Sequence, residues 1–119
     1  MSLYDELGGG DALQAALNRF YEKVLVDPPL AVFFEGHDVE RIKARQKLFW
    51  SEALGGNFKY NGDLRASHQG TRDRGVNDEL FDRFVGHFED TLKEFGVPEE
   101  KIGQVMAITE KHRVDILGG

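Results

Sequence analysis

Apolar residues recur every three or four positions along most of this chain, which is the spacing of amphipathic helices. Asp11, Asp38 and Asn77 each stand just before such a stripe, where a polar side chain can cap the first turn of a helix. No stretch alternates apolar and polar residues as a half-buried strand does, so the pattern predicts an all-α fold. The expected helices cover 3–7, the stretch between Asp11 and Asp27, a short turn at 30–35, the stretch between Asp38 and Gly55, 77–95 and 98–117.

One segment breaks this pattern. Residues 63–75 (DLRASHQGTRDRG) carry almost no apolar side chains, although the segments on both sides are rich in Phe, Leu, Val and Trp. Leu64 and His68, one helical turn apart, form its only face that could pack, so burial of its own side chains cannot hold it in place. A metal or a metal-bearing cofactor would hold it, because neutral imidazole is the commonest metal ligand. The alternative is a surface loop with an incidental His.

Three polar residues fall on the inward stripes of expected helices: Tyr21, Gln46 and His112. A buried amide or phenol must find a hydrogen-bond partner, or it costs about 1–3 kcal/mol. Taken singly, each of the three fits a core residue whose hydrogen bonds are satisfied. Taken with His68, Tyr21 and Gln46 place two hydrogen-bond donors and one candidate metal ligand in the same apolar interior.

Length and composition narrow the alternatives. A chain of 119 residues has room for one domain, 1–119. Its net charge of −6 argues against binding to nucleic acid or to an anionic membrane, and no apolar run is long enough to span a membrane. The absence of cysteine excludes disulfides, zinc fingers, iron–sulfur clusters and thiolate-ligated haem, and no signal peptide is evident, so a cytoplasmic protein is expected.

Several short motifs follow one another along residues 2–117: LYDELGG, RFYEKVL, the pair Phe33-Phe34, ARQKLF, ALGG and the isolated His68. In this order and spacing the chain resembles the truncated haemoglobins of the first group, the short two-over-two globins. The resemblance implies two antiparallel helix pairs crossed around haem b. One pair would hold Tyr21 and Gln46, and the other would be 77–95 with 98–117. The cofactor would supply the apolar surface that the His68 segment lacks.

The resemblance also implies a role for each matching residue. His68 matches the proximal ligand of the haem iron, and Tyr21 and Gln46 match the distal pair that hydrogen-bonds the bound ligand. Ile42 is apolar at a distal position that is polar in many relatives. Arg45 stands where some relatives have an iron-binding His; a guanidinium has no lone pair to offer, so a contact with a haem propionate is expected, and a solvated surface charge is the alternative. The other residues expected at the cofactor are Phe34, Phe49, Trp50, Val76, Phe81 and His112.

His112 carries a further expectation, because some cyanobacterial relatives bond a His aligned with it to a haem vinyl group; an ordinary core or edge His is the alternative. For function, the resemblance implies a monomer that binds O₂, NO and CO. One hypothesis is conversion of NO and bound O₂ to nitrate, with a cellular reductase restoring ferrous haem. A second is an O₂ carrier, store or sensor without turnover, and a third is a helical interaction module without haem.

Overall fold

The computed structural model describes residues 2–55, 75–113 and 117, and every regular element in this part of the chain is helical. This confirms the predicted all-α fold. The elements are α1 (Leu3–Glu6), α2 (Gly9–Leu25), α3 (Pro28–Ala31), the 3₁₀ turn η1 (Val32–Phe34), α4 (Val39–Ala53), α7 (Asp78–Glu94) and α8 (Glu99–Lys111).

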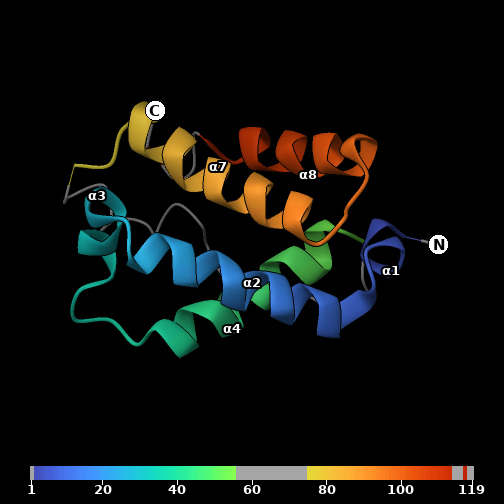
Figure 1. The fold of residues 1–119 in the computed structure, drawn as a ribbon, viewed down its shortest axis with the longest axis horizontal. Helices are drawn as coiled ribbons and strands as arrows, with labels where there is room; N and C mark the ends of the chain where they lie inside the picture. The colour runs from blue at the N-terminus through green and yellow to red at the C-terminus, as the bar shows by residue number, and fades with distance from the viewer. Residues whose placement is uncertain (1, 56–74, 114–116, 118–119) are drawn as a thin grey trace.

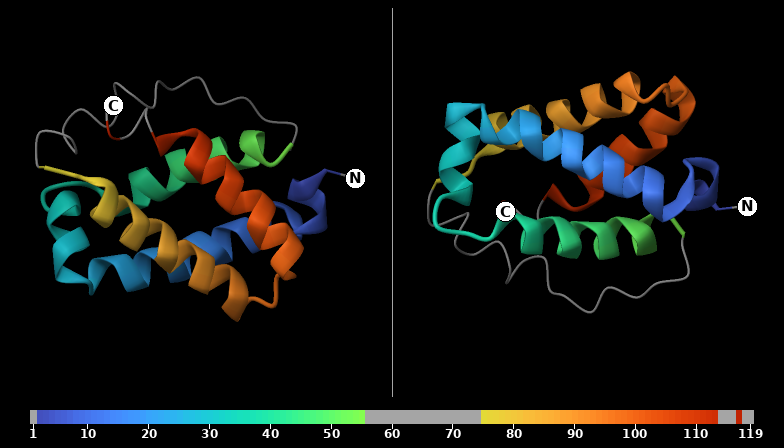
Figure 2. Two further views of the ribbon diagram at one scale, coloured as in Figure 1. Left: turned by 90° about the horizontal axis from the view of Figure 1, so that it is seen from above. Right: turned by 60° about the horizontal axis from the view of Figure 1, so that its bottom comes forward.

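The long helices form two antiparallel pairs. Helix α2 packs against α4 in one pair and α7 packs against α8 in the other, while α2 also contacts α7 and so joins the pairs. Figure 1 shows the second pair lying above the first. Figure 2 shows the same crossed arrangement from above and from below, and in its right-hand view α2 lies between α4 and α7. These two helix pairs are the ones that the resemblance implied.

Local side-chain chemistry sets where several helices begin. Asp38 accepts hydrogen bonds from the backbone N–H groups of Glu40 and Arg41 at 3.1 and 3.3 Å. Asn77 accepts one from the N–H of Leu80 at 2.9 Å. Both predicted caps are therefore confirmed, because each side chain satisfies an N–H group that has no partner inside its helix.

The predicted cap at Asp11 is wrong. Helix α2 begins at Gly9, three residues earlier than a cap at Asp11 would give, and its N-cap is Gly8 with a φ of 106°. Only glycine adopts this backbone conformation without strain, and a Cβ at Gly8 would lie 2.8 Å from the Cβ of Ala12. Asp11 instead lies in the first turn, where its negative charge interacts favourably with the helix dipole.

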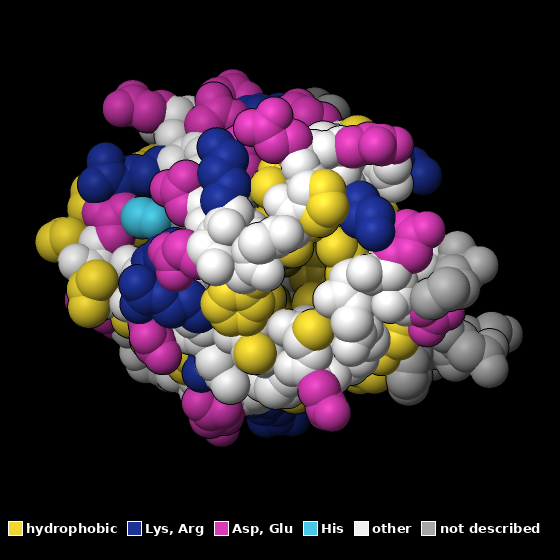
Figure 3. Space-filling model, turned by 45° about the vertical axis from the view of Figure 1, so that its right-hand side comes forward, with side chains coloured by type: hydrophobic (Ala, Val, Ile, Leu, Met, Phe, Trp, Pro, Cys, Tyr) yellow, Lys and Arg dark blue, Asp and Glu magenta, His cyan; other side chains and the backbone are white. Residues whose placement is uncertain are grey.

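The core lies where the two pairs cross. Leu17 and Val24 of α2 and Val105 of α8 are almost completely buried within one apolar cluster, to which α4 contributes Trp50 and α7 contributes Phe88. On the face drawn in Figure 3, hydrophobic side chains surround a hollow. Among the described helices, none is both long and apolar enough to cross a membrane.

The last helix was predicted over residues 98–117. Helix α8 ends at Lys111 with His112 as its C-cap, and Arg113 and Leu117 beyond it are also helical. Ile116, the last apolar residue of the predicted stripe, lies outside the described residues.

Candidate functional site

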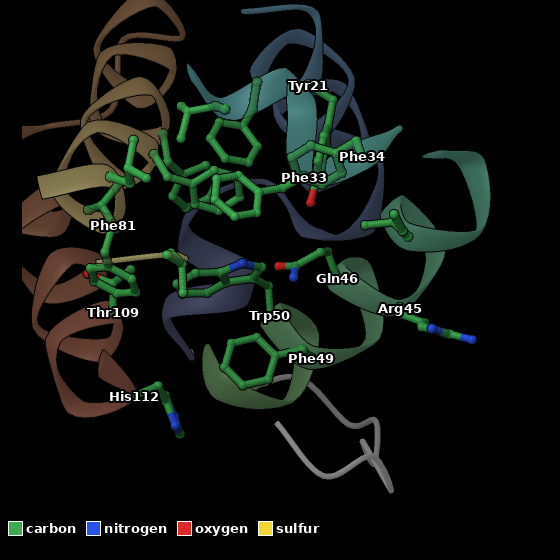
Figure 4. Close-up of a pocket in the computed structure, with 18 of the residues that line it drawn as sticks. Tyr21, Phe33, Phe34, Arg45, Gln46, Phe49, Trp50, Phe81, Thr109 and His112 are labelled. Carbon is green, nitrogen blue, oxygen red and sulfur yellow. The ribbon is translucent and has the colours of Figure 1, made fainter. Parts of the chain in front are cut away.

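A cavity of about 280 Å³ opens between the two helix pairs, close to the lower end of the roughly 300–1,000 Å³ that is typical of ligand sites. Nine of its 19 lining residues are Phe, Tyr or Trp, and they come from α2, η1, α4 and α7. Figure 4 shows these rings arranged around the space. A lining of this kind suits a large, flat, apolar ligand.

The aromatic rings of the lining pack against one another. Phe34 of η1 stacks on Phe84 of α7 with ring centres 6.3 Å apart and planes 16° apart. Trp50 of α4 stacks on Phe88 of α7 at 5.1 Å and 29°. Stacked and edge-on pairs of this kind stabilise by about 0.5–1.5 kcal/mol beyond their burial, so the walls are organised in advance.

Two polar side chains face this apolar space from different helices. Tyr21 of α2 is 1% exposed, and its ring meets the edge of Phe34 at 5.6 Å. Burial raises the pKa of the Tyr21 phenol well above its usual range, so the group stays neutral and keeps its O–H as a donor. In Figure 4 the Tyr21 hydroxyl and the Gln46 amide of α4 both point into the cavity.

The distal edge of the cavity is formed by α4. Half-buried Ile42 lines it without offering a hydrogen-bond donor. Arg45 also lines the cavity at its rim, but its side chain is exposed and extends outward in Figure 4. Phe49 and Trp50 follow on the same helix and line the interior.

At the far side of the cavity, Val76 and Phe81 belong to the lining. His112, the C-cap of α8, lines it too and lies edge-on to Phe49 with ring centres 5.2 Å apart. His68 lies outside the described residues. Within the described part of the chain, no group of three His, Cys, Asp or Glu side chains could hold a metal ion.

Sequence reasoning missed several lining residues. Phe84, Val85 and Phe88 belong to the apolar stripe of α7, but that pattern indicates burial and does not separate a packed core from a cavity wall. His37 also lines the cavity, and it comes from the loop before α4, where periodicity carries no information.

A second polar cluster, formed by Asp27, Arg83 and His87, was also missed. The buried Asp27 carboxylate accepts two hydrogen bonds from Arg83, both at 2.6 Å, and lies 2.7 Å from Nε2 of His87. Hydrogen bonds from Arg83 and then His87 lower the pKa of Asp27 to about 2. The cluster fastens α3, which leads into Phe34, to α7, which carries Phe84, and so holds two walls of the cavity together.

Comparison with known proteins agrees with this geometry. Residues 2–117 match the family described as bacterial-like globin. The chain is 39% identical over 120 residues to a group 1 truncated haemoglobin of Synechocystis, covering 98% of this chain and 97% of that protein. The fold matches the 2/2 haemoglobin of a Synechococcus species, solved in the cyanomet state with covalently attached haem, with a TM-score of 0.95, 36% identity and all of both chains covered.

A ferric truncated haemoglobin from Tetrahymena pyriformis also matches, with a TM-score of 0.90, 32% identity and 98% of each chain covered. The same protein has been solved in variants that replace a tyrosine by phenylalanine or a glutamine by glutamate.

Proposed function

The chain belongs to the bacterial-like globins as a group 1 truncated haemoglobin with haem as its cofactor, and from this premise we propose that it oxidises nitric oxide to nitrate with the dioxygen it binds. Membership of the family accounts for the binding of small gas ligands such as O₂.

One arrangement supports the proposal: a neutral phenol and an amide from different helices face the same aromatic cavity. When bound, haem supplies the iron for the diatomic ligand and the one electron that conversion of NO and O₂ to nitrate consumes. We assign the Tyr21 O–H as the donor that binds the outer oxygen of the ligand, where negative charge gathers. Such preorganised donors act strongly in a site that excludes water.

Gln46 assists this donor. Its amide can hydrogen-bond the ligand or the Tyr21 oxygen, and so keep the phenol turned toward the ligand. Ile42 and Arg45 provide no lone pair for the iron, so the distal position stays open to O₂. We assign the proximal iron ligand to His68 on the sequence resemblance, with Phe34, Phe49, Trp50, Val76 and Phe81 packing on the cofactor and Arg45 near a propionate.

The apolar lining serves the reaction as well as binding. Phe34, Phe84, Trp50 and Phe88 pack in stacked pairs and leave few polar atoms to hold water beside the ligand. A site that excludes water strengthens the hydrogen bond from Tyr21 to the bound ligand. It also slows side reactions of that ligand with water. NO is small and apolar and enters such a site without a desolvation cost.

A single-turnover experiment tests the reaction without any reductase. Ferrous protein, loaded with haem and saturated with O₂, is mixed with one equivalent of NO, while nitrate and the haem spectrum are measured. We expect about one nitrate for each haem oxidised to the ferric form. Replacement of O₂ by NO, with no nitrate formed, would favour an O₂ carrier or store instead.

A further inference from the structure

The charges of this acidic protein are unevenly distributed. Helix α4 carries four Lys or Arg and two Glu, a charge of +2, within a chain of −6. No acidic residue occurs between Arg41 and Ser51. By contrast, acidic and basic side chains lie next to one another on the face drawn in Figure 3. An acidic partner would therefore be drawn toward α4.

Two arginines of α4 differ from the other described arginines. Arg19, Arg83 and Arg113 each bind carboxylates of neighbouring helices or loops. Arg41 and Arg45 are exposed, and neither forms an ion pair or a side-chain hydrogen bond with any residue in the described ranges. The Arg41 guanidinium therefore remains available to a partner's carboxylates, which it binds in a fork geometry, while Arg45, assigned to a propionate, adds positive charge beside it.

Arg41 and Arg45 lie one turn apart on the same face of α4. Leu48, the next residue toward the helix end on this face, is 47% exposed. Arg45 borders the cavity, and Phe49 on the adjoining face of the helix lines its interior. The three residues Arg41, Arg45 and Leu48, here called the α4 stripe, therefore combine positive charge with an apolar contact at the edge of the haem site.

We propose that the α4 stripe is the docking surface for an acidic electron-transfer protein that reduces the haem. This rests on the proposed function, because each turnover leaves ferric haem that must be reduced. The transfer moves one electron from the reduced donor to ferric iron, which becomes ferrous, and no atom is transferred. Arginine is enriched in interface cores, and complementary charge speeds encounter by roughly 10- to 1,000-fold.

The position of the stripe suits electron transfer. A donor seated on α4 lies against the same helix that forms the distal wall of the cavity, so its redox group and the haem are separated by little more than one layer of side chains. Helix α7 also lines the cavity, but it carries six Asp or Glu against one Arg and one Lys, a charge of −4, which would repel an acidic donor.

The informative variant is Arg41→Glu, because Arg41 does not line the cavity and its replacement leaves the haem site intact. Arg45 is less suitable, since its loss would change haem binding as well. Lys93→Glu on α7 is the matched control: Lys93 is exposed, forms no ion pair with a described residue, and its reversal changes the net charge by the same amount.

Binding is measured first, by titrating oxidised flavodoxin, an acidic redox protein, into the ferric protein in low salt and following amide chemical shifts. We expect the largest shifts at Arg41, Ala44 and Leu48, and an affinity at least about 10-fold weaker for Arg41→Glu but only about two-fold weaker for Lys93→Glu. Equal weakening by the two variants, or shifts centred away from α4, would overturn the proposal.

Reduction is then followed by stopped flow, with reduced flavodoxin as donor and CO to trap ferrous haem. The rate constant should fall at least about 10-fold for Arg41→Glu, and the difference from wild type should vanish at about 0.5 M salt, where screening lengths are only a few ångströms. Reduction by dithionite should be the same in all three proteins. Because the single-turnover nitrate experiment uses protein reduced beforehand, failure of the docking proposal leaves the proposed reaction untouched.

Discussion

The guanidinium of Arg113 lies over the ring of Phe81, 4.5 Å from its centre. The same group binds three carboxylates: Asp78 and Asp82 in the first turns of α7, and Glu110 in the last turn of α8. Hydrogen bonds with Glu110 and Asp82 raise the pKa of Arg113 above its usual range. Phe81 lines the cavity, so Arg113 fastens the end of α8 to the start of α7 beside the haem site.

Replacing Arg113 with Met should therefore loosen the haem as well as the fold. The cation–π contact contributes about 0.5–1 kcal/mol and each partly exposed ion pair about 0.2–1 kcal/mol, so we expect a loss of about 1–2 kcal/mol in urea denaturation. Release of haem to an excess of apomyoglobin should become several-fold faster. Arg19→Met, which also removes ion pairs but lies away from the cavity, should leave haem release unchanged. Equal release from both variants would contradict this role.

Asp27 should make the protein sensitive to acid between about pH 4 and pH 2. Its pKa in the folded protein is about 2, below the usual 3.8, so the unfolded chain binds a proton first as the pH falls. The stability contributed by the Asp27 carboxylate is thus complete above about pH 4 and is lost toward pH 2. Asp27→Asn should lose about 1.5–3 kcal/mol at neutral pH and show a shallower decline in acid.

The measurement is urea denaturation at a series of pH values. Asp90→Asn is the control, because Asp90 is an exposed carboxylate near the same cluster and forms no ion pair with a described residue. It should follow the wild-type pH profile. An unchanged profile for Asp27→Asn would show that the contacts with Arg83 and His87 contribute no net stability.

His68→Leu should abolish stable haem retention, because it removes the imidazole assigned as the bond between the protein and the iron. The expected result is protein that purifies without a Soret band, or loses it on gel filtration. Full haem content with an unchanged ferrous spectrum would be incompatible with the assignment, and His112 and His37, which both line the cavity, would then be the candidates.

Tyr21→Phe should speed O₂ dissociation by roughly 10- to 100-fold, since a hydrogen bond to a charged partner is worth about 1.5–3 kcal/mol. Gln46→Leu should act in the same direction with a smaller effect. The double variant should fall short of the product of the two effects, because both side chains serve one ligand. Stopped-flow dissociation rates measure all three, and a Tyr21→Phe rate equal to wild type would rule out this hydrogen bond.

Reduction of the haem-loaded protein should attach the haem covalently to His112. His112 lines the cavity beside Phe49, which places an imidazole at the cofactor site. After dithionite treatment, intact-mass analysis should show the polypeptide heavier by one haem, and His112→Ala should lack this adduct. If all the haem of the wild-type protein extracts into acidified organic solvent, His112 has a packing role only.

Features that depend on interactions within one helical turn could be predicted from the sequence. The starts of α4 and α7 follow from Asp38 and Asn77, because a cap and the N–H groups that it binds are at most three residues apart. The inward positions of Tyr21 and Gln46 follow from helical periodicity. The predicted cap at Asp11 was wrong for a local reason as well. Asp11 is a good capping residue, but the left-handed backbone of Gly8 lets α2 begin earlier.

The features that could not be predicted from the sequence are contacts between residues that are distant in the chain. Nothing in the pattern around Asp27 distinguishes it from an ordinary helix stop, yet its carboxylate binds Arg83 and His87, which lie 56 and 60 positions away. Likewise, an apolar stripe shows that Phe84 is buried but not whether its neighbour is another side chain or a cofactor. Most helices, the motifs of the family and the inward faces could be predicted from the chain, because they depend on local spacing. Which inward faces meet and leave a cavity depends on how α2, α4, α7 and α8 cross, and local spacing does not specify that crossing.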